Sequence, residues 1–159
     1  MKKWTCIILL ALGLVAFASL PNRTVAASES GTVTSAASGA FASGAVLNSV
    51  VLSSLDLGTG VFIEADGTAS GVFNAVLAGH SVLGVPQQIT VDGNVKRGAI
   101  APDGRAYLSG LATVNFGNGM PALSGVPFSA TTTASSLVLA IGATTLPAAQ
   151  LTEGTVSIQ

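Results

Sequence analysis

The chain is poor in the side chains that most enzymes and metal sites use. Its 159 residues include one cysteine, one tryptophan, one histidine and one tyrosine, and only 8% of them are charged. The cysteine is Cys6 and the tryptophan is Trp4, so the chain after residue 27 contains neither. Zinc sites are built mainly from cysteine and histidine. We therefore expect neither a metal site nor a cofactor.

Basic residues are scarce as well. After residue 27, three basic residues stand against seven acidic ones, which gives a formal net charge of −4. Binding to nucleic acid requires a basic face, and we expect no nucleic-acid partner. Without cysteine this part of the chain forms no disulfide, so its stability must come from a hydrophobic core. A length of about 130 residues is enough to build one.

The first residues have the pattern of a secretory signal peptide. Lys2 and Lys3 precede an apolar run over residues 6–20, and small residues follow it. A membrane-spanning helix needs about 20 apolar residues, so we expect a cleaved signal rather than an anchor. Cleavage after Ala18 and cleavage after Ala27 both fit. The sequence thus predicts a signal peptide over 1–27, a secreted or periplasmic protein, and no stable membrane span after cleavage.

The remaining residues have the period-two pattern of strands. Residues 28–42 are either a flexible lead-in or a weak first strand, and residues 43–159 are expected to form a single β domain. The clearest strand covers 106–116, where Ala106, Leu108 and Val114 share a face that suits a core. The run 137–141 is apolar on both faces and predicts a buried strand. Because such a segment is prone to aggregate, self-association stays open.

Short glycine-containing turns separate these strands. Asp66-Gly67, Asp92-Gly93, residues 102–104 and residues 117–119 supply the positive φ angles that tight hairpins need. Consecutive hairpins predict an all-β fold with an antiparallel meander. Because open sheet edges invite aggregation, we expect the meander to be closed as a small barrel or folded as a two-sheet sandwich.

Several of these segments carry a resemblance. Residues 60–73, 89–94, 111–119 and 154–159 resemble a loose group of small secreted bacterial all-β proteins with Asp-Gly hairpins. That group has no established activity. The resemblance therefore implies an exported β protein, and it transfers no functional residue to this chain.

His80 is the first candidate for catalysis, because histidine is the most frequent general base of enzymes. It precedes Ser81 in the segment 79–84, which is similar to the nucleophile elbow of α/β-hydrolases. The segment has one residue too many before its second glycine, and no second histidine is present to activate the serine. A triad of His80 with a distant serine stays open. We favour a loop histidine.

Glu64 and Asp66 are the second candidate, because a pair of carboxylates hydrolyses glycosides. Asp66 lies in a predicted hairpin turn, where aspartate is expected for backbone reasons. Glu64 follows an apolar run and suits a position at the rim of the sheet.

We therefore predict a secreted, non-enzymatic β module with a structural, surface or binding role. Two alternatives stay open. One is a small barrel that binds an apolar ligand, and the other is a hydrolase that uses His80 or Glu64. The sequence does not specify ligand-binding residues or a partner.

Overall fold

The computed structural model describes residues 30–42 and 44–159, and every regular element in this part of the chain is a strand. The signal peptide predicted over 1–27 lies outside it. Among the described residues, no helix has the length and apolar character needed to cross a membrane. The ten strands are β1 (Gly31–Phe41), β2 (Val46–Leu47), β3 (Val50–Ile63), β4 (Thr68–Ser81), β5 (Pro86–Ile100), β6 (Ala106–Asn115), β7 (Leu123–Thr132), β8 (Ser136–Ile141), β9 (Thr144–Thr145) and β10 (Ala149–Ile158).

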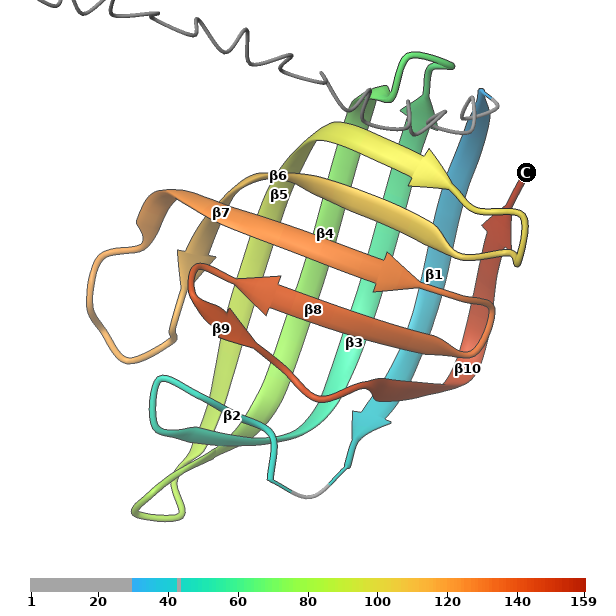
Figure 1. Ribbon diagram of the computed structural model, residues 1–159. Coiled ribbons are helices and arrows are strands. Elements are labelled where there is room, and N and C mark those ends of the chain that lie inside the picture. The colour runs from blue at the N-terminus through green and yellow to red at the C-terminus, as the bar shows by residue number, and fades with distance from the viewer. Residues whose placement is uncertain (1–29, 43) are drawn as a thin grey trace, which may run out of the picture.

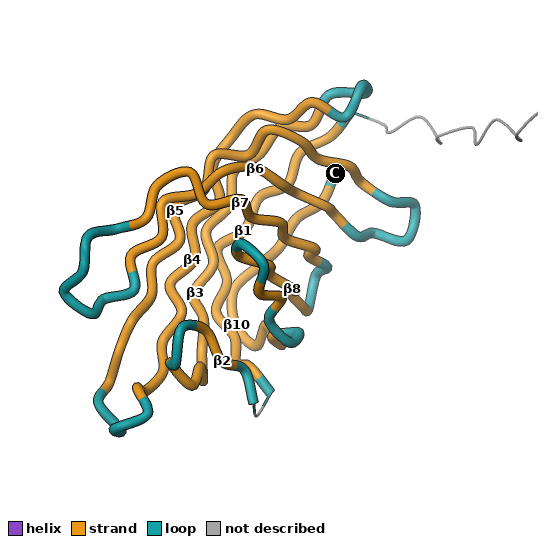
Figure 2. Tube along the Cα trace, turned by 60° about the vertical axis from the view of Figure 1, so that its left-hand side comes forward, coloured by secondary structure: helices purple, strands orange, loops and turns teal. Residues whose placement is uncertain are grey.

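Eight of these strands close into a hydrogen-bonded ring (Figures 1 and 2). Following the pairing from β1, the order is β10, β8, β7, β6, β5, β4 and β3, and β3 pairs again with β1. All the pairings are antiparallel. The short strands β2 and β9 add to β3 and β8. The prediction of an all-β, antiparallel meander is confirmed.

β1 completes the ring. It comprises most of the segment for which a flexible lead-in and a weak first strand were both open. Its register with β3 runs from Gly31 opposite Ile63 to Ala40 opposite Ser54, and its other edge pairs with β10. Because both of its edges are paired, β1 presents no open edge between Val33 and Ala40.

Three of the four predicted turns connect strands as expected. Between β3 and β4, Gly67 has a φ of 81°, and its amide donates a hydrogen bond of 2.9 Å to the carbonyl of Glu64. Gly104 has a φ of 79° between β5 and β6, and residues 117–119 lie between β6 and β7. L-residues with a Cβ avoid such φ angles, so these glycines fix where the chain reverses.

The fourth turn prediction is wrong. Asp92 and Gly93 lie in the middle of β5, opposite Asn74 and Phe73 of β4. Gly93 faces the interior of the ring, and a Cβ placed on it would lie 2.7 Å from Cε1 of Phe128. The glycine is needed here because the aromatic ring covers its backbone, not because the chain turns.

The interior of the ring is occupied by side chains. Between the bulges of β3 to β8, buried residues alternate with residues that are exposed or half-buried, and the rings of Phe73 and Phe128 stack in the interior with centroids 5.2 Å apart. The predicted core face of β6 is confirmed, since Ala106, Leu108 and Val114 are buried. In β8, residues 137, 139 and 141 are buried whereas 138 and 140 are half-buried, so the predicted strand is fully covered on one face only.

Candidate functional site

His80 lies at the end of β4 and not in a loop, which corrects the interpretation from the sequence. It is exposed and stands opposite Val51 of β3 and Pro86 of β5. Neighbouring residues of a strand point to opposite faces, so the side chains of His80 and Ser81 diverge. The hydroxyl of Ser81 instead accepts a hydrogen bond of 3.3 Å from the amide of Val85. The two residues therefore form no nucleophile–base pair.

The acidic residues of the neighbouring strands lie far from His80. Asp56 stands opposite Val76, and Asp92 stands opposite Asn74. These positions are four and six residues from His80, or about 13 and 20 Å along the strand. A catalytic triad needs a carboxylate in hydrogen-bonding contact with the histidine, and neither acid meets this condition.

Glu64 and Asp66 lie at the opposite end of β4. Asp66 is held in the turn by Thr68, whose hydroxyl and amide donate hydrogen bonds of 2.6 and 2.8 Å to its Oδ1. The hydrogen bond from the Thr68 hydroxyl is the main reason why the pKa of Asp66 is lowered. Since β4 has fourteen residues, about 40 Å of strand separates this turn from His80. The four candidate residues therefore do not form one site.

The other candidate groups for chemistry are a surface ion pair and potential metal ligands. Asp103 and Arg105 form an exposed ion pair in the β5–β6 turn, and the hydrogen bond from Arg105 lowers the pKa of Asp103. Within residues 30–42 and 44–159, no group of three or more His, Asp or Glu residues is arranged to hold a metal ion.

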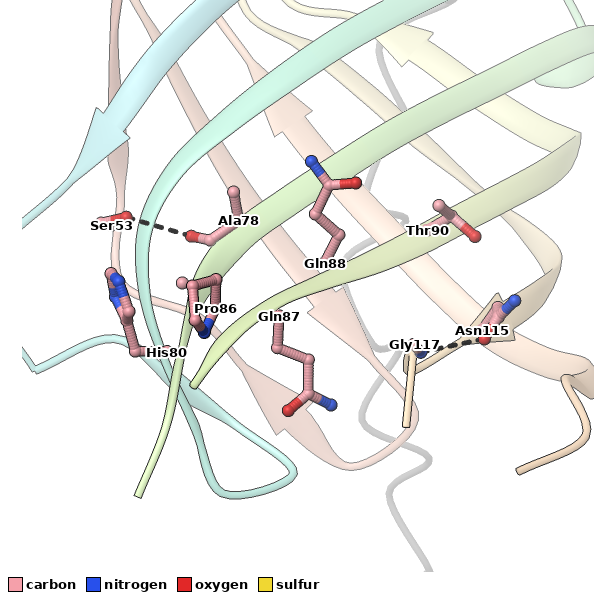
Figure 3. A pocket seen from close by; sticks show the side chains of 10 residues that line it. Ser53, Ala78, His80, Pro86, Gln87, Gln88, Thr90, Asn115 and Gly117 are labelled. Atoms are coloured by element: carbon pink, nitrogen blue, oxygen red, sulfur yellow. Dashed lines mark hydrogen bonds between the residues drawn. The ribbon is translucent and has the colours of Figure 1, made fainter. Parts of the chain in front are cut away.

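A hollow of about 680 Å³ lies beside His80, over the adjoining ends of β3, β4, β5 and β6. Figure 3 shows its lining from close by, with Gln87 and Gln88 pointing to opposite sides of β5. The lining contains no Asp, Glu, Lys or Arg, and it consists of Ser53, Ala78, Gly79, His80, Pro86, Gln87, Gln88, Thr90, Asn115 and Gly117.

Hydrogen bonds within the hollow fix part of this lining. The side-chain amide of Gln87 donates to the carbonyl of Phe116 at 2.6 Å, and Ser53 donates to the carbonyl of Ala78 at 3.2 Å. Oδ1 of Asn115 accepts from the amide of Gly117 at 2.9 Å, so its NH₂ group stays available. Hydroxyl and amide side chains both donate and accept hydrogen bonds. The hollow thus offers neutral polar groups to a ligand.

Sequence reasoning found His80 but missed the other lining residues. Gln88, Thr90 and Asn115 lie at alternate positions on the outward face of predicted strands, and this pattern marked them only as solvent-facing. They come together because Thr90 stands opposite Asn115 in the register of β5 with β6. That register depends on residues about 25 positions apart in the chain.

Comparisons with protein-family models, with curated proteins and with solved structures found no match.

Proposed function

We propose that this protein is a secreted, non-enzymatic β module that binds a neutral, hydroxyl-rich ligand of the oligosaccharide class on its outer wall. The observation that carries the proposal is the uncharged hollow beside His80, lined by serine, threonine, asparagine and glutamine side chains. Sugar hydroxyls donate and accept hydrogen bonds, as these side chains do. The secreted location rests on the signal-peptide pattern of residues 1–27.

The non-enzymatic part of the proposal is supported by the separation of the candidate residues. No acid of the described chain forms an ion pair with His80, Ser81 points to the other face of the strand, and Glu64 and Asp66 lie at the far end of β4. General acid–base catalysis needs its groups within hydrogen-bonding reach of each other or of the substrate. The alternative of an apolar ligand inside the ring has less support, because the core side chains occupy the interior.

Binding is tested by titrating the ¹⁵N-labelled protein with cellohexaose, maltohexaose and chitohexaose. We expect amide shifts concentrated at Gln88, Thr90 and Asn115 for at least one sugar. Asn115→Ala should weaken this binding about tenfold, because it removes the available NH₂ donor and the hydrogen bond from Gly117 that holds this side chain in place. Asn94→Ala is the matched control, since Asn94 is also exposed on the outer wall. Absence of any shift at the hollow would refute the binding proposal.

The absence of catalysis is tested with p-nitrophenyl butyrate and p-nitrophenyl glycosides. We expect the wild type to hydrolyse neither above the buffer rate. A hydrolysis rate that is measurable in the wild type and lost in His80→Ala or Glu64→Gln would show that the protein is an enzyme.

A further inference from the structure

The β4–β5 loop carries the two most exposed large apolar side chains of the described chain, Leu83 and Val82. Val82, Leu83 and Val85 are 76%, 86% and 58% exposed, and together they are called the apolar tip. In Figures 1 and 2 this loop, at the lower end of β4 and β5, extends beyond the other loops of that end. The tip is thus a convex projection that a flat or soft surface can meet.

Exposed apolar side chains continue from the tip onto the adjoining wall. Val51 stands opposite His80 at the end of β4, and Val46 stands opposite Val51 in turn. Both valines are about half exposed. Contiguous exposed apolar surface of this kind marks an interaction site more often than scattered apolar residues do.

Among the described residues, the end of the ring that carries the tip has no formally charged side chain. Because the strands alternate in direction, the connections at residues 44–49, 82–85, 116–122 and 142–148 all lie at this end. None of these segments contains Asp, Glu, Lys or Arg. The charged residues of the described chain lie in the walls or at the other end, and they are Asp56, Glu64, Asp66, Asp92, Lys96, Arg97, Asp103, Arg105 and Glu153.

Part of the backbone of the loop is paired by the loop's own hydrogen bonds. The amide of Gly84 donates to the carbonyl of Ser81 at 2.8 Å, and the amide of Ser81 donates to the carbonyl of Val85 at 2.9 Å. The amide of Val85 donates to the Ser81 hydroxyl. Backbone groups without a partner make entry into an apolar phase costly, and these hydrogen bonds pair two amides of the loop and that of Ser81 at its base.

We infer that the apolar tip inserts into the surface of an uncharged lipid layer and holds the protein there peripherally. The absence of charge at this end matches a zwitterionic phospholipid surface, since attraction to anionic lipids requires Lys or Arg near the surface. A second copy of the chain fits less well. Stable protein interfaces use about 20–30 residues on each side, and a convex tip of three side chains does not provide such an area. This inference is independent of ligand binding in the hollow.

The test places a nitrobenzoxadiazole fluorophore at position 85 in Cys6→Ser/Val85→Cys and adds phosphatidylcholine vesicles. We expect the emission to rise severalfold and to shift to shorter wavelength as the tip enters the acyl region. The matched control carries the fluorophore on the wall, in Cys6→Ser/Leu111→Cys, because Leu111 is 52% exposed but distant from the tip in β6. No change at 85, or an equal change at 111, overturns the inference.

A second substitution shows whether Leu83 drives insertion. Adding Leu83→Asp to the protein labelled at 85 should raise the lipid concentration for half-maximal emission roughly tenfold or more, since aspartate is strongly disfavoured in the bilayer. Adding Leu111→Asp should leave it unchanged. Both sites are exposed, and circular dichroism checks that the variants fold. The inference is overturned if Leu83→Asp has no effect, if binding requires phosphatidylglycerol, or if the emission rises with protein concentration alone.

Discussion

The packing of Gly93 against Phe128 gives a quantitative prediction. A Cβ at position 93 would lie 2.7 Å from Cε1 and 2.8 Å from Cζ of Phe128, and 3.2 Å from the carbonyl oxygen of Phe73. In Gly93→Ala the aromatic ring must move away from its partner Phe73, although both rings are almost fully buried. Overpacking of a core costs about 1–3 kcal/mol. Replacing a strand glycine returns about 0.5–1 kcal/mol, so the central values leave a net loss of about 1 kcal/mol.

The assay is urea unfolding followed by far-ultraviolet circular dichroism. The free energy of unfolding falls with urea concentration by about 1–3 kcal/mol per molar for small proteins. The predicted loss of stability therefore lowers the urea concentration at the unfolding midpoint by roughly 0.3–1 M. Gly58→Ala is the matched control. Gly58 also lies within a long strand, but a Cβ there has no atom within 4 Å, so this variant should be as stable as the wild type or slightly more stable.

A double-mutant cycle separates the steric clash from other effects. Phe128→Leu alone removes the aromatic pair and destabilises the protein. In Gly93→Ala/Phe128→Leu the added methyl group no longer meets the ring, so the double variant should be more stable than the sum of the single losses by about 1 kcal/mol. Gly93→Ala at wild-type stability, or strictly additive losses in the cycle, would refute the proposed packing of the interior.

Other properties of the fold can be tested in the same way. Thr68→Ala should raise the pKa of Asp66, followed by carboxyl NMR, because it removes the main hydrogen bond that lowers it; an unchanged titration would contradict this. The pKa of Asp66 is lower in the folded state, so its stabilising contribution is present at neutral pH and is lost as the pH falls through that pKa. The free energy of unfolding of Asp66→Asn should therefore decrease less between neutral and acidic pH than that of the wild type. Gly104→Ala should cost about 1–2 kcal/mol in urea unfolding, because open space surrounds the site and only the φ of 79° opposes a side chain; unchanged stability would count against that geometry. The amides of residues 137–141 should exchange slowly with deuterium in the soluble monomer, because residues 137, 139 and 141 are buried and β8 is paired with β7; rapid exchange there would show that the segment is open.

Local features of the sequence were sufficient for the fold class and for most turns. The alternation over 106–116 identified the buried face of β6, and the glycines at 67 and 104 marked two reversals of the chain. These features are local, because a strand's two faces and a turn's φ angles depend on a few consecutive residues. The scarcity of reactive side chains is likewise a property of the composition and does not depend on how the chain folds.

The role of a glycine, in contrast, could not be inferred from the neighbouring residues in the sequence. A glycine serves either a turn that needs a positive φ or a close approach that leaves no room for a Cβ. At Gly93 the choice depends on Phe128, which lies 35 positions further along the chain and packs on it from β7. The dipeptide Asp92-Gly93 looks the same in both cases, so the turn prediction failed there.

The antiparallel chain of strands and its low charge follow from the amino-acid sequence alone, because composition and period-two alternation are properties of each segment. Which residues meet in space depends on how the strands pack and pair. The register of β4 with β3 and β5 separates His80 from Asp56 and Asp92, the register of β5 with β6 builds the hollow, and the antiparallel order of the strands places the uncharged connections at one end. Such contacts join residues far apart in the chain, and their positions follow from packing in the common core rather than from any single segment.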